Sequence, residues 1–209
     1  MVLDAYRDLA DKFLKPMARS LGTVNPDTLS WAALVCALGG GIAVAIGGGW
    51  ALALATLLVL LNALLDALDG KVARATGRAS TRGDFLDHVL DRYADVFVLG
   101  GVAVSPYCPP TLGFLAIIGV LLTSYMGTQA QAVGLKRHYG GLLGRADRLV
   151  ILVAALALQA IVDPSGQTLL GFGPASLTIL GWAMAVFAVL GNVTAIQRAV
   201  GIWRRLSFG

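Results

Sequence analysis

Cysteine, histidine and charged residues are scarce in this chain of 209 residues, which has two cysteines, two histidines and 13% charged residues. Cys36 falls in an apolar run and Cys108 in a turn, so a disulfide between them would join opposite levels of a bilayer. Neither cysteine is spaced to bind zinc, and His88 and His138 stand alone, as residues of a polar helix face or loop usually do. These scarcities argue against a disulfide-stapled domain and against a zinc site.

Apolar residues are abundant instead: they make up 57% of the chain, and the mean hydropathy is +0.76. Windows of about 20 residues, the length that crosses a bilayer, identify six apolar stretches. They lie near 29–48, 50–72, 84–105, 110–133, 147–163 and 174–198. We therefore expect an all-α integral membrane protein with six transmembrane helices. Residues 1–209 are expected to form a single membrane domain, with a six-helix core over 23–200 and a cytoplasmic tail over 201–209.

The first 20 residues carry acids and bases throughout and lack the pattern of a cleavable signal peptide. Residues 1–22 are instead expected to form one helix. Apolar residues recur there every three to four positions, at Leu3, Tyr6, Ala10, Phe13, Met17 and Leu21. This spacing predicts an amphipathic helix that lies in the membrane interface, or alternatively one that packs on the transmembrane helices.

Lysine and arginine are confined to alternate connections between the apolar stretches. All 16 lie before the first stretch, around the second and fourth turns, or after the last stretch, and the other three turns contain none. The positive-inside rule then places both termini at the cytoplasmic face of the cell membrane, together with the turn between the second and third stretches. Membrane topology therefore accounts for the net positive charge of the chain, and nucleic-acid binding is not needed to explain it.

Four aspartates interrupt the apolar pattern at the end of the second stretch (Asp66 and Asp69) and the start of the third (Asp87 and Asp91). A charge near the bilayer centre costs about 2.5–3.5 kcal/mol, so bound cations are expected to compensate for them. Each pair shares a helix face, and the short connection 75–82 predicts antiparallel neighbouring helices whose pairs converge. A cluster of carboxylates alone suits Mg²⁺ or Mn²⁺, and four aspartates could hold two ions.

Three further residues beside the aspartates suggest a phosphate-containing ligand. Gly70 and Gly83 leave room for phosphates to approach the backbone, and Arg74 lies one turn beyond Gly70. A guanidinium next to a metal pair is suited to a diphosphate. Helix packing by the glycines and a purely topogenic role of Arg74 are the alternatives.

Residues 66–91 match the pattern D-x2-D-G-x2-A-R-x8-G-x3-D-x3-D at every fixed position. The chain thereby resembles the CDP-alcohol phosphotransferase family. The resemblance implies that Asp66, Asp69 and Asp87 bind two divalent metal ions, and that Asp91 binds metal and acts as general base. It also implies that Arg74, Gly70 and Gly83 hold the diphosphate of a CDP-linked donor, that CMP is released, and that the protein is a homodimer.

Two more patches resemble donor contacts of this family. The run 25–30 contains Asp27, Thr28, Leu29 and Ser30 at the start of the first stretch, and it also reads as a helix cap. Ser80 matches a hydroxyl position near the donor, with an ordinary polar loop residue as the alternative.

Basic residues around the fourth turn are the candidates for binding a phosphorylated acceptor: Lys136, Arg137, Arg145 and Arg148. Arg145 and Arg148 resemble the paired arginines of the phosphatidylinositol-phosphate synthase branch. That branch also has basic residues after a Ser-Tyr pair, whereas Ser124 and Tyr125 are followed here by Gly127 and Gln129. Because of this departure, the acceptor could be a phosphorylated polyol other than inositol phosphate. The alternative interpretation of the arginines is that they only set the membrane topology.

The expected reaction moves a phosphatidyl-type phosphate from a CDP-linked lipid, based on diacylglycerol or archaeol, to a small polar alcohol such as glycerol phosphate or inositol phosphate. The alternative enzyme transfers a head-group phosphate from a soluble CDP-alcohol to a lipid alcohol or polyol. A transporter or ion pathway is a third reading, disfavoured because the acids gather at one face and no inverted repeat is visible.

Overall fold

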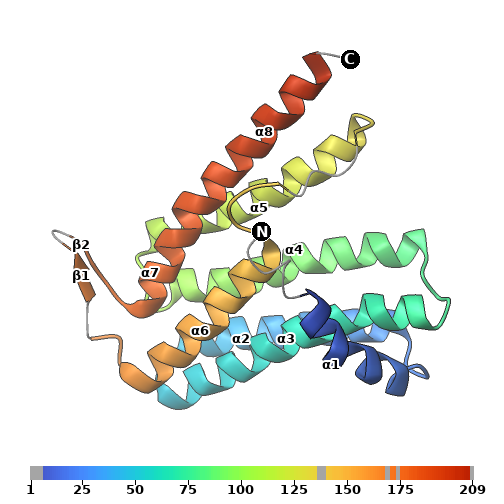
Figure 1. Cartoon of the computed structure of the whole chain (residues 1–209). Coiled ribbons are helices and arrows are strands. Elements are labelled where there is room, and N and C mark those ends of the chain that lie inside the picture. Colours follow the sequence, from blue (N-terminus) through green and yellow to red (C-terminus); the bar gives the residue numbers. More distant parts are fainter. Residues whose placement is uncertain (1–6, 136–139, 168–169, 173–174, 208–209) are drawn as a thin grey trace.

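The computed structural model describes residues 7–135, 140–167, 170–172 and 175–207, and these are mostly helical (Figure 1). The elements, in chain order, are α1 (Arg7–Ser20), α2 (Pro26–Ile46), α3 (Gly49–Ala75), α4 (Thr81–Val104), α5 (Pro110–Ala132), α6 (Arg145–Val162), β1 (Leu170–Phe172), β2 (Ala175–Leu177), α7 (Ile179–Val186), the π-helical turn η2 (Phe187–Gly191) and α8 (Asn192–Ser207).

Every predicted apolar stretch coincides with a helix, and the helices begin where local capping allows. The Asn25 side chain accepts a hydrogen bond from the backbone N–H of Asp27 and Pro26 fills the first turn, so α2 begins there. The last stretch was predicted to begin at residue 174, but the helix begins at Ile179. Residues 175–177 instead pair with 170–172 as a short antiparallel hairpin, and the Thr178 side chain caps α7.

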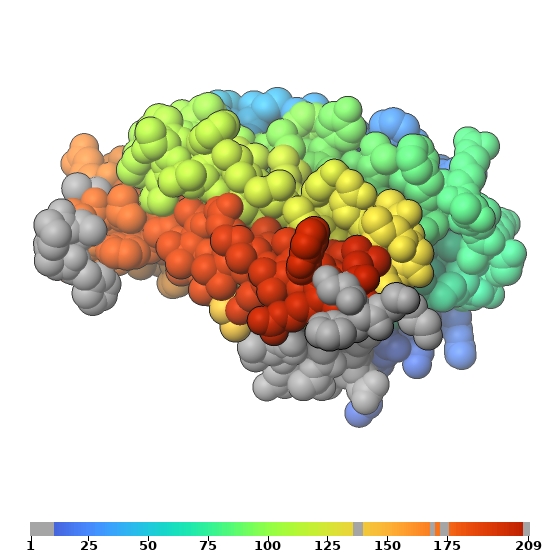
Figure 2. Space-filling view, turned by 90° about the horizontal axis from the view of Figure 1, so that it is seen from above, coloured from blue at the N-terminus to red at the C-terminus, as the bar shows by residue number. Residues whose placement is uncertain are grey.

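Among the described residues, four helices are long and apolar enough to cross a membrane: α2, α3, α5 and the continuous helix Ile179–Leu206. Polar residues interrupt α4 and begin α6, so the structure does not by itself establish six transmembrane helices. Figure 2 shows α7 and α8 lying along α5 on one face of the molecule.

Helix α2 packs against both α3 and α4, whereas α3 and α4 contact each other only weakly within the described residues. A Cβ on Gly41 would lie 2.2 Å from the Phe97 carbonyl oxygen, and one on Gly101 would lie 2.1 Å from the Gly41 carbonyl oxygen. These small residues bring the α2 and α4 backbones together, as glycines do between membrane helices. The α3 and α4 backbones therefore pack less closely against each other than either packs against α2, although the aspartates of the two helices do meet, as predicted.

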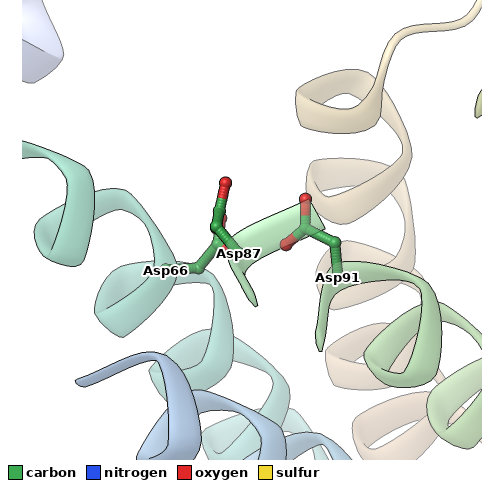
Figure 3. Close-up of side chains that lie close together, drawn as sticks. All are labelled: Asp66, Asp87 and Asp91. Atoms are coloured by element: carbon green, nitrogen blue, oxygen red, sulfur yellow. The ribbon is translucent and has the colours of Figure 1, made fainter. Parts of the chain in front are cut away.

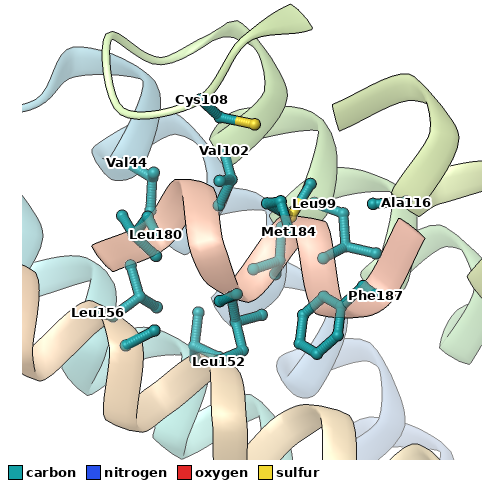
Figure 4. Packing of buried hydrophobic residues seen from close by; sticks show 14 of the residues in the cluster. Val44, Leu99, Val102, Cys108, Ala116, Leu152, Leu156, Leu180, Met184 and Phe187 are labelled. Atoms are coloured by element: carbon teal, nitrogen blue, oxygen red, sulfur yellow. The ribbon is translucent and has the colours of Figure 1, made fainter. Parts of the chain in front are cut away.

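The apolar core joins residues of all the helices from α2 to α7 and of η2 (Figure 4). Val44, Leu156, Leu180, Met184 and Phe187 are fully buried there. At this end of the bundle the Tyr107 hydroxyl donates to the Pro164 carbonyl oxygen (2.8 Å) and accepts from the Gly48 N–H (2.7 Å). The three connections that contain no Lys or Arg thus meet at the end of the bundle opposite the aspartates.

The first helix docks on α3 through a small apolar cluster of Ala18 with Leu29, Leu68 and Val72. Lys71 of α3 also donates a hydrogen bond to Asp11, which together with Lys15 lowers the pKa of that carboxyl below its usual value. Phe13 stays 67% exposed. Helix α1 therefore packs on a membrane helix while keeping an exposed apolar side chain, which combines features of both predicted placements.

Candidate active site

Three of the four predicted aspartates converge between α3 and α4. Asp66, Asp87 and Asp91 each place a carboxylate oxygen within 4.8 Å of the others, and Figure 3 shows the side chains extending into the same space. Asp87 and Asp91 share a face because they are one turn apart in α4. Oxygens bound to one Mg²⁺ lie at most about 4.2 Å apart, so small side-chain movements would let all three coordinate a hard cation.

The fourth aspartate, Asp69, is held slightly apart by two donors. Its carboxylate accepts a hydrogen bond from the Ser30 hydroxyl (2.5 Å) and another from the Gly70 N–H (2.5 Å). Asp69 nevertheless lines one small cavity with Asp66, Asp87 and Asp91. The four carboxylates thus surround a common space, with α2 supplying the hydroxyl that orients one of them.

A pocket of about 150 Å³ opens on one side of the aspartates. Six of the eight predicted donor residues line it: Asp27, Ser30, Gly70, Arg74, Ser80 and Gly83. Thr28 and Leu29 do not line it, because residues 26, 27 and 30 share the face of α2 that meets the pocket. Thr28 is exposed on another face, and Leu29 is buried against α1 and α3.

The two glycines have distinct local roles in this pocket. A Cβ on Gly70 would lie 3.3 Å from Nη1 of Arg74, so the absence of a side chain lets the guanidinium fold back along α3. The N–H of Gly83 donates to the Ser80 hydroxyl (3.1 Å), which caps α4. Arg78, which the sequence suggested only as a topogenic charge, also lines the pocket and donates to the Val24 carbonyl oxygen.

A second pocket, of about 260 Å³, lies on the other side of Asp91 between α4 and α5. Its lining residues are His88, Asp91, Arg92, Leu121, Ser124, Tyr125 and Thr128. The Ser-Tyr pair noted in the sequence therefore faces the same space as Asp91. His88 and Arg92 were not predicted as site residues. His88 precedes Asp91 by three residues and so lies on nearly the same face of α4, which is the signal that could have found it. Arg92 directly follows Asp91 in the sequence, and only the structure shows that it lines this pocket.

Two of the predicted acceptor arginines, Arg145 and Arg148, form ion pairs with aspartates. Nη1 of Arg145 is 2.7 Å from Asp66, and its Nη2 is 2.6 Å from Asp91. The Gly144 N–H donates to the Asp147 carboxylate, which fixes the first turn of α6 and with it Arg145. Arg148 is only 6% exposed, with its Nη2 3.5 Å from Asp95. Lys136 and Arg137 lie outside the described residues.

Comparison with known proteins yields a consistent set of similarities. A family model described as CDP-alcohol phosphatidyltransferase matches residues 23–194. The archaetidylinositol phosphate synthase of Methanothermobacter thermautotrophicus is 28% identical over 98% of this chain and 96% of its own length. The phosphatidylinositol phosphate synthase of Cutibacterium acnes is 30% identical over 77% of this chain and 80% of its own length.

Other relatives match a shorter part of the chain. The archaetidylinositol phosphate synthase of Pyrococcus horikoshii is 36% identical over 52% of this chain, which spans 57% of that relative. Among solved structures, Mycobacterium tuberculosis phosphatidylinositol phosphate synthase with CDP-DAG bound superposes with a TM-score of 0.74 at 24% identity, covering 92% of this chain and 94% of that one. The fold is therefore shared.

Proposed function

Because the chain belongs to the CDP-alcohol phosphatidyltransferase family, we propose that it transfers a phosphatidyl-type phosphate from a CDP-linked lipid to the hydroxyl of a small phosphorylated polyol, releasing CMP. The resemblance seen in the signature is confirmed, and the named relatives fall in the inositol phosphate synthase branch. The observation that carries the proposal is the placement of the signature aspartates between two pockets.

The pocket next to Asp69 and Asp87 is the proposed donor site. Arg74 and Arg78 supply two guanidiniums there, and the backbone at Gly70 and Gly83 is open to close approach. The family relationship and the CDP-DAG bound to the Mycobacterium tuberculosis protein support a CDP-linked lipid as the ligand. The lipid part can be diacylglycerol or, as the archaeal relatives suggest, archaeol.

The donor set of the aspartates fits divalent ions that prefer oxygen ligands, and a related structure contains manganese. Asp66, Asp69, Asp87 and Asp91 are the proposed ligands of two Mg²⁺ or Mn²⁺ ions. Such ions stabilise charge on the diphosphate and on the leaving CMP. Ser30 and the Gly70 N–H keep the Asp69 carboxylate oriented toward the shared cavity.

Asp91 is the proposed general base because it faces both the aspartate cavity and the second pocket. Its carboxylate takes the proton of the acceptor hydroxyl as the oxygen attacks the lipid phosphorus. A new P–O bond forms to the acceptor while the P–O bond to CMP breaks, and CMP leaves as an anion. The acceptor therefore enters from the α4 and α5 side, opposite the donor.

The acceptor class follows from the charges around this entrance. Arg92 lines the second pocket, and Arg145 reaches Asp66 and Asp91 from α6. These cations suit a phosphorylated polyol, and the names of the relatives favour inositol phosphate. Glycerol phosphate stays a second candidate because Gly127 and Gln129 stand where the branch has basic residues.

The chain is a multi-pass membrane protein. We further propose that α4 and α6 cross the membrane with the four more apolar helices, giving six transmembrane helices with the termini and the aspartates at the cytoplasmic face of the plasma membrane. The confinement of Lys and Arg to alternate connections supports this topology. The single-domain organisation and the homodimer stay predictions.

The test is CMP release by the purified protein in detergent. CDP-diacylglycerol or CDP-archaeol is supplied with Mg²⁺ or Mn²⁺ and one acceptor from a panel of inositol phosphate, glycerol phosphate, inositol and serine. We expect metal-dependent CMP release with a phosphorylated acceptor and none after chelation. Absence of metal-dependent CMP with every acceptor would refute the proposal. Turnover only of a soluble CDP-alcohol with a lipid alcohol would establish the alternative enzyme, which transfers a head-group phosphate to the lipid.

A further inference from the structure

The polar cluster continues one helical turn beyond the signature, to a fifth aspartate on α4. Asp95 lies four residues after Asp91 and therefore on the same face of the helix. Its side chain is only 11% exposed, and it is not one of the three aspartates whose oxygens gather within 4.8 Å. Asp95 thus lies near the reacting groups but is not one of the proposed metal ligands.

Two arginines from different helices meet at this carboxylate. Nη2 of Arg92 lies 3.5 Å from Oδ2 of Asp95, and Nη2 of Arg148 lies 3.5 Å from the same oxygen. Arg92 belongs to α4 and Arg148 to the first turn of α6. A buried cation needs an anionic partner, so Asp95 links the two helices through charge.

Arg92 is the arginine in the wall of the proposed acceptor pocket. Its Nη2 also lies 3.4 Å from Asp91, so it sits between Asp91 and Asp95. Metal binding and proton transfer require the oxygens of Asp91, but they do not require those of Asp95. Asp95 can therefore keep Arg92 in the pocket wall throughout the reaction.

Arg148 links the Asp95 carboxylate to Arg145, the second arginine on the acceptor side. It follows Arg145 by three residues in α6, which puts both on nearly the same face of that helix. Arg145 in turn contacts Asp66 and Asp91. Fixing Arg148 against Asp95 fixes the turn from which Arg145 extends.

We propose that Asp95 is a positioning residue for the acceptor side: it orients Arg92 directly and Arg145 through Arg148, so that an anionic acceptor binds beside Asp91. This inference rests on the proposed function for the identity of the acceptor. It extends the site to a carboxylate outside the signature, and it predicts a defect in acceptor binding that exceeds any change in donor or metal binding.

The first experiment compares Asp95→Asn with the full-length wild type in detergent, using Mn²⁺, CDP-diacylglycerol and the acceptor that gives turnover. Loss of a partner that orients a binding group typically weakens function by about tenfold or more, so we expect the acceptor KM to rise about tenfold. The donor KM should change by less than about twofold, because Asp95 does not line the proposed donor pocket. The Mn²⁺ dissociation constant should change less than the acceptor KM, because Asp95 reaches the proposed metal ligands only through the arginines. Asp95→Glu, which keeps the charge, should restore part of the acceptor affinity.

A purely structural role of Asp95, as the partner of buried Arg148, makes different predictions. The double variant Asp95→Asn with Arg148→Met removes the buried pair together, which is often tolerated for stability. We expect it to regain thermal stability and to keep the high acceptor KM. Asp163→Asn, a buried aspartate at the far end of α6, should lower stability without changing the acceptor KM. A wild-type acceptor KM in the single or the double variant would overturn the proposal, as would an equal loss of donor, metal and acceptor binding.

Failure of the proposed function can be told apart from failure of this inference. If the wild type turns over no acceptor, the proposed function fails, and the role of Asp95 is judged by calorimetric titration with inorganic phosphate. Phosphate binding about tenfold weaker in Asp95→Asn than in the wild type supports the positioning role. Equal behaviour of the two proteins toward phosphate overturns it.

Discussion

Two polar networks lie at opposite ends of the helix bundle, and they are built differently. Around Tyr107 the partners are mostly backbone groups: its hydroxyl bonds Gly48 and Pro164, and its carbonyl oxygen accepts from Thr178. Gln159 similarly bonds Asp163 and the Leu180 N–H. These contacts hold the ends of helices together, as expected of a buried network whose groups have partners within the protein.

The network around Asp66 and Asp91 is made of charged side chains from three helices and is bordered by two pockets. Carboxylates gathered this closely repel one another unless cations lie between them. Arginines supply part of that positive charge, and the shared cavity has the donors that divalent ions prefer. The first network thus stabilises the fold, whereas the second is the network that we propose to bind ligands.

The largest expected effect concerns the end of the bundle that holds the proposed active site. Asp91→Asn removes the proposed base and should lower turnover by about 10²–10⁴-fold, because an amide cannot accept the acceptor proton. CMP release gives the turnover, and binding of CDP-diacylglycerol shows whether the donor site persists. Asp163→Asn is the matched control at the other end and should retain turnover per folded molecule. Near wild-type turnover in Asp91→Asn would remove Asp91 as the base.

The opposite end should respond in stability rather than in chemistry. Tyr107→Phe deletes a buried hydroxyl that bonds two backbone groups, which should destabilise the protein by about 1–3 kcal/mol. Thermal unfolding in detergent measures the loss, and turnover of the remaining folded protein should be unchanged. A fall in turnover without a fall in melting temperature would contradict the division between the two networks.

The smallest expected effect concerns α1, which packs on α3 near the aspartates, outside the main helix core. The contact with Lys71 lowers the pKa of Asp11 below 3.8, so the pair stabilises the folded protein above that pH and is lost as the pH falls through the folded pKa. Asp11→Asn should therefore lower the melting temperature slightly near neutral pH.

The difference between wild type and Asp11→Asn should shrink at acidic pH, and melting curves at about pH 6 and about pH 3 measure it. Lys12→Gln on the same helix serves as the charge control. A difference that grows on acidification would show that the pair does not stabilise the docked helix.

Much of the site could be predicted because its spacing is local. Positions 87 and 91 share a helix face wherever the helix lies, and Gly70 and Arg74, which follow Asp69, line the pocket that we propose as the donor site. Thr28 and Leu29 were predicted as donor residues from a run of neighbours, yet successive positions of a helix face different directions. Only part of such a run can meet one pocket.

The sequence by itself determined the apolar helices, the grouping of the aspartates and the family, because each depends on residues within a few helical turns of one another. The tertiary structure decided that α2 packs against both α3 and α4, that Ser30 holds Asp69, and that Arg145 reaches Asp66 from 79 residues away. It also placed Arg92 in the wall of the proposed acceptor pocket and Asp95 next to Arg92 and Arg148. These contacts depend on how closely helices pack, as at Gly41 and Gly101, and the spacing of residues along one helix carries no information about its partners.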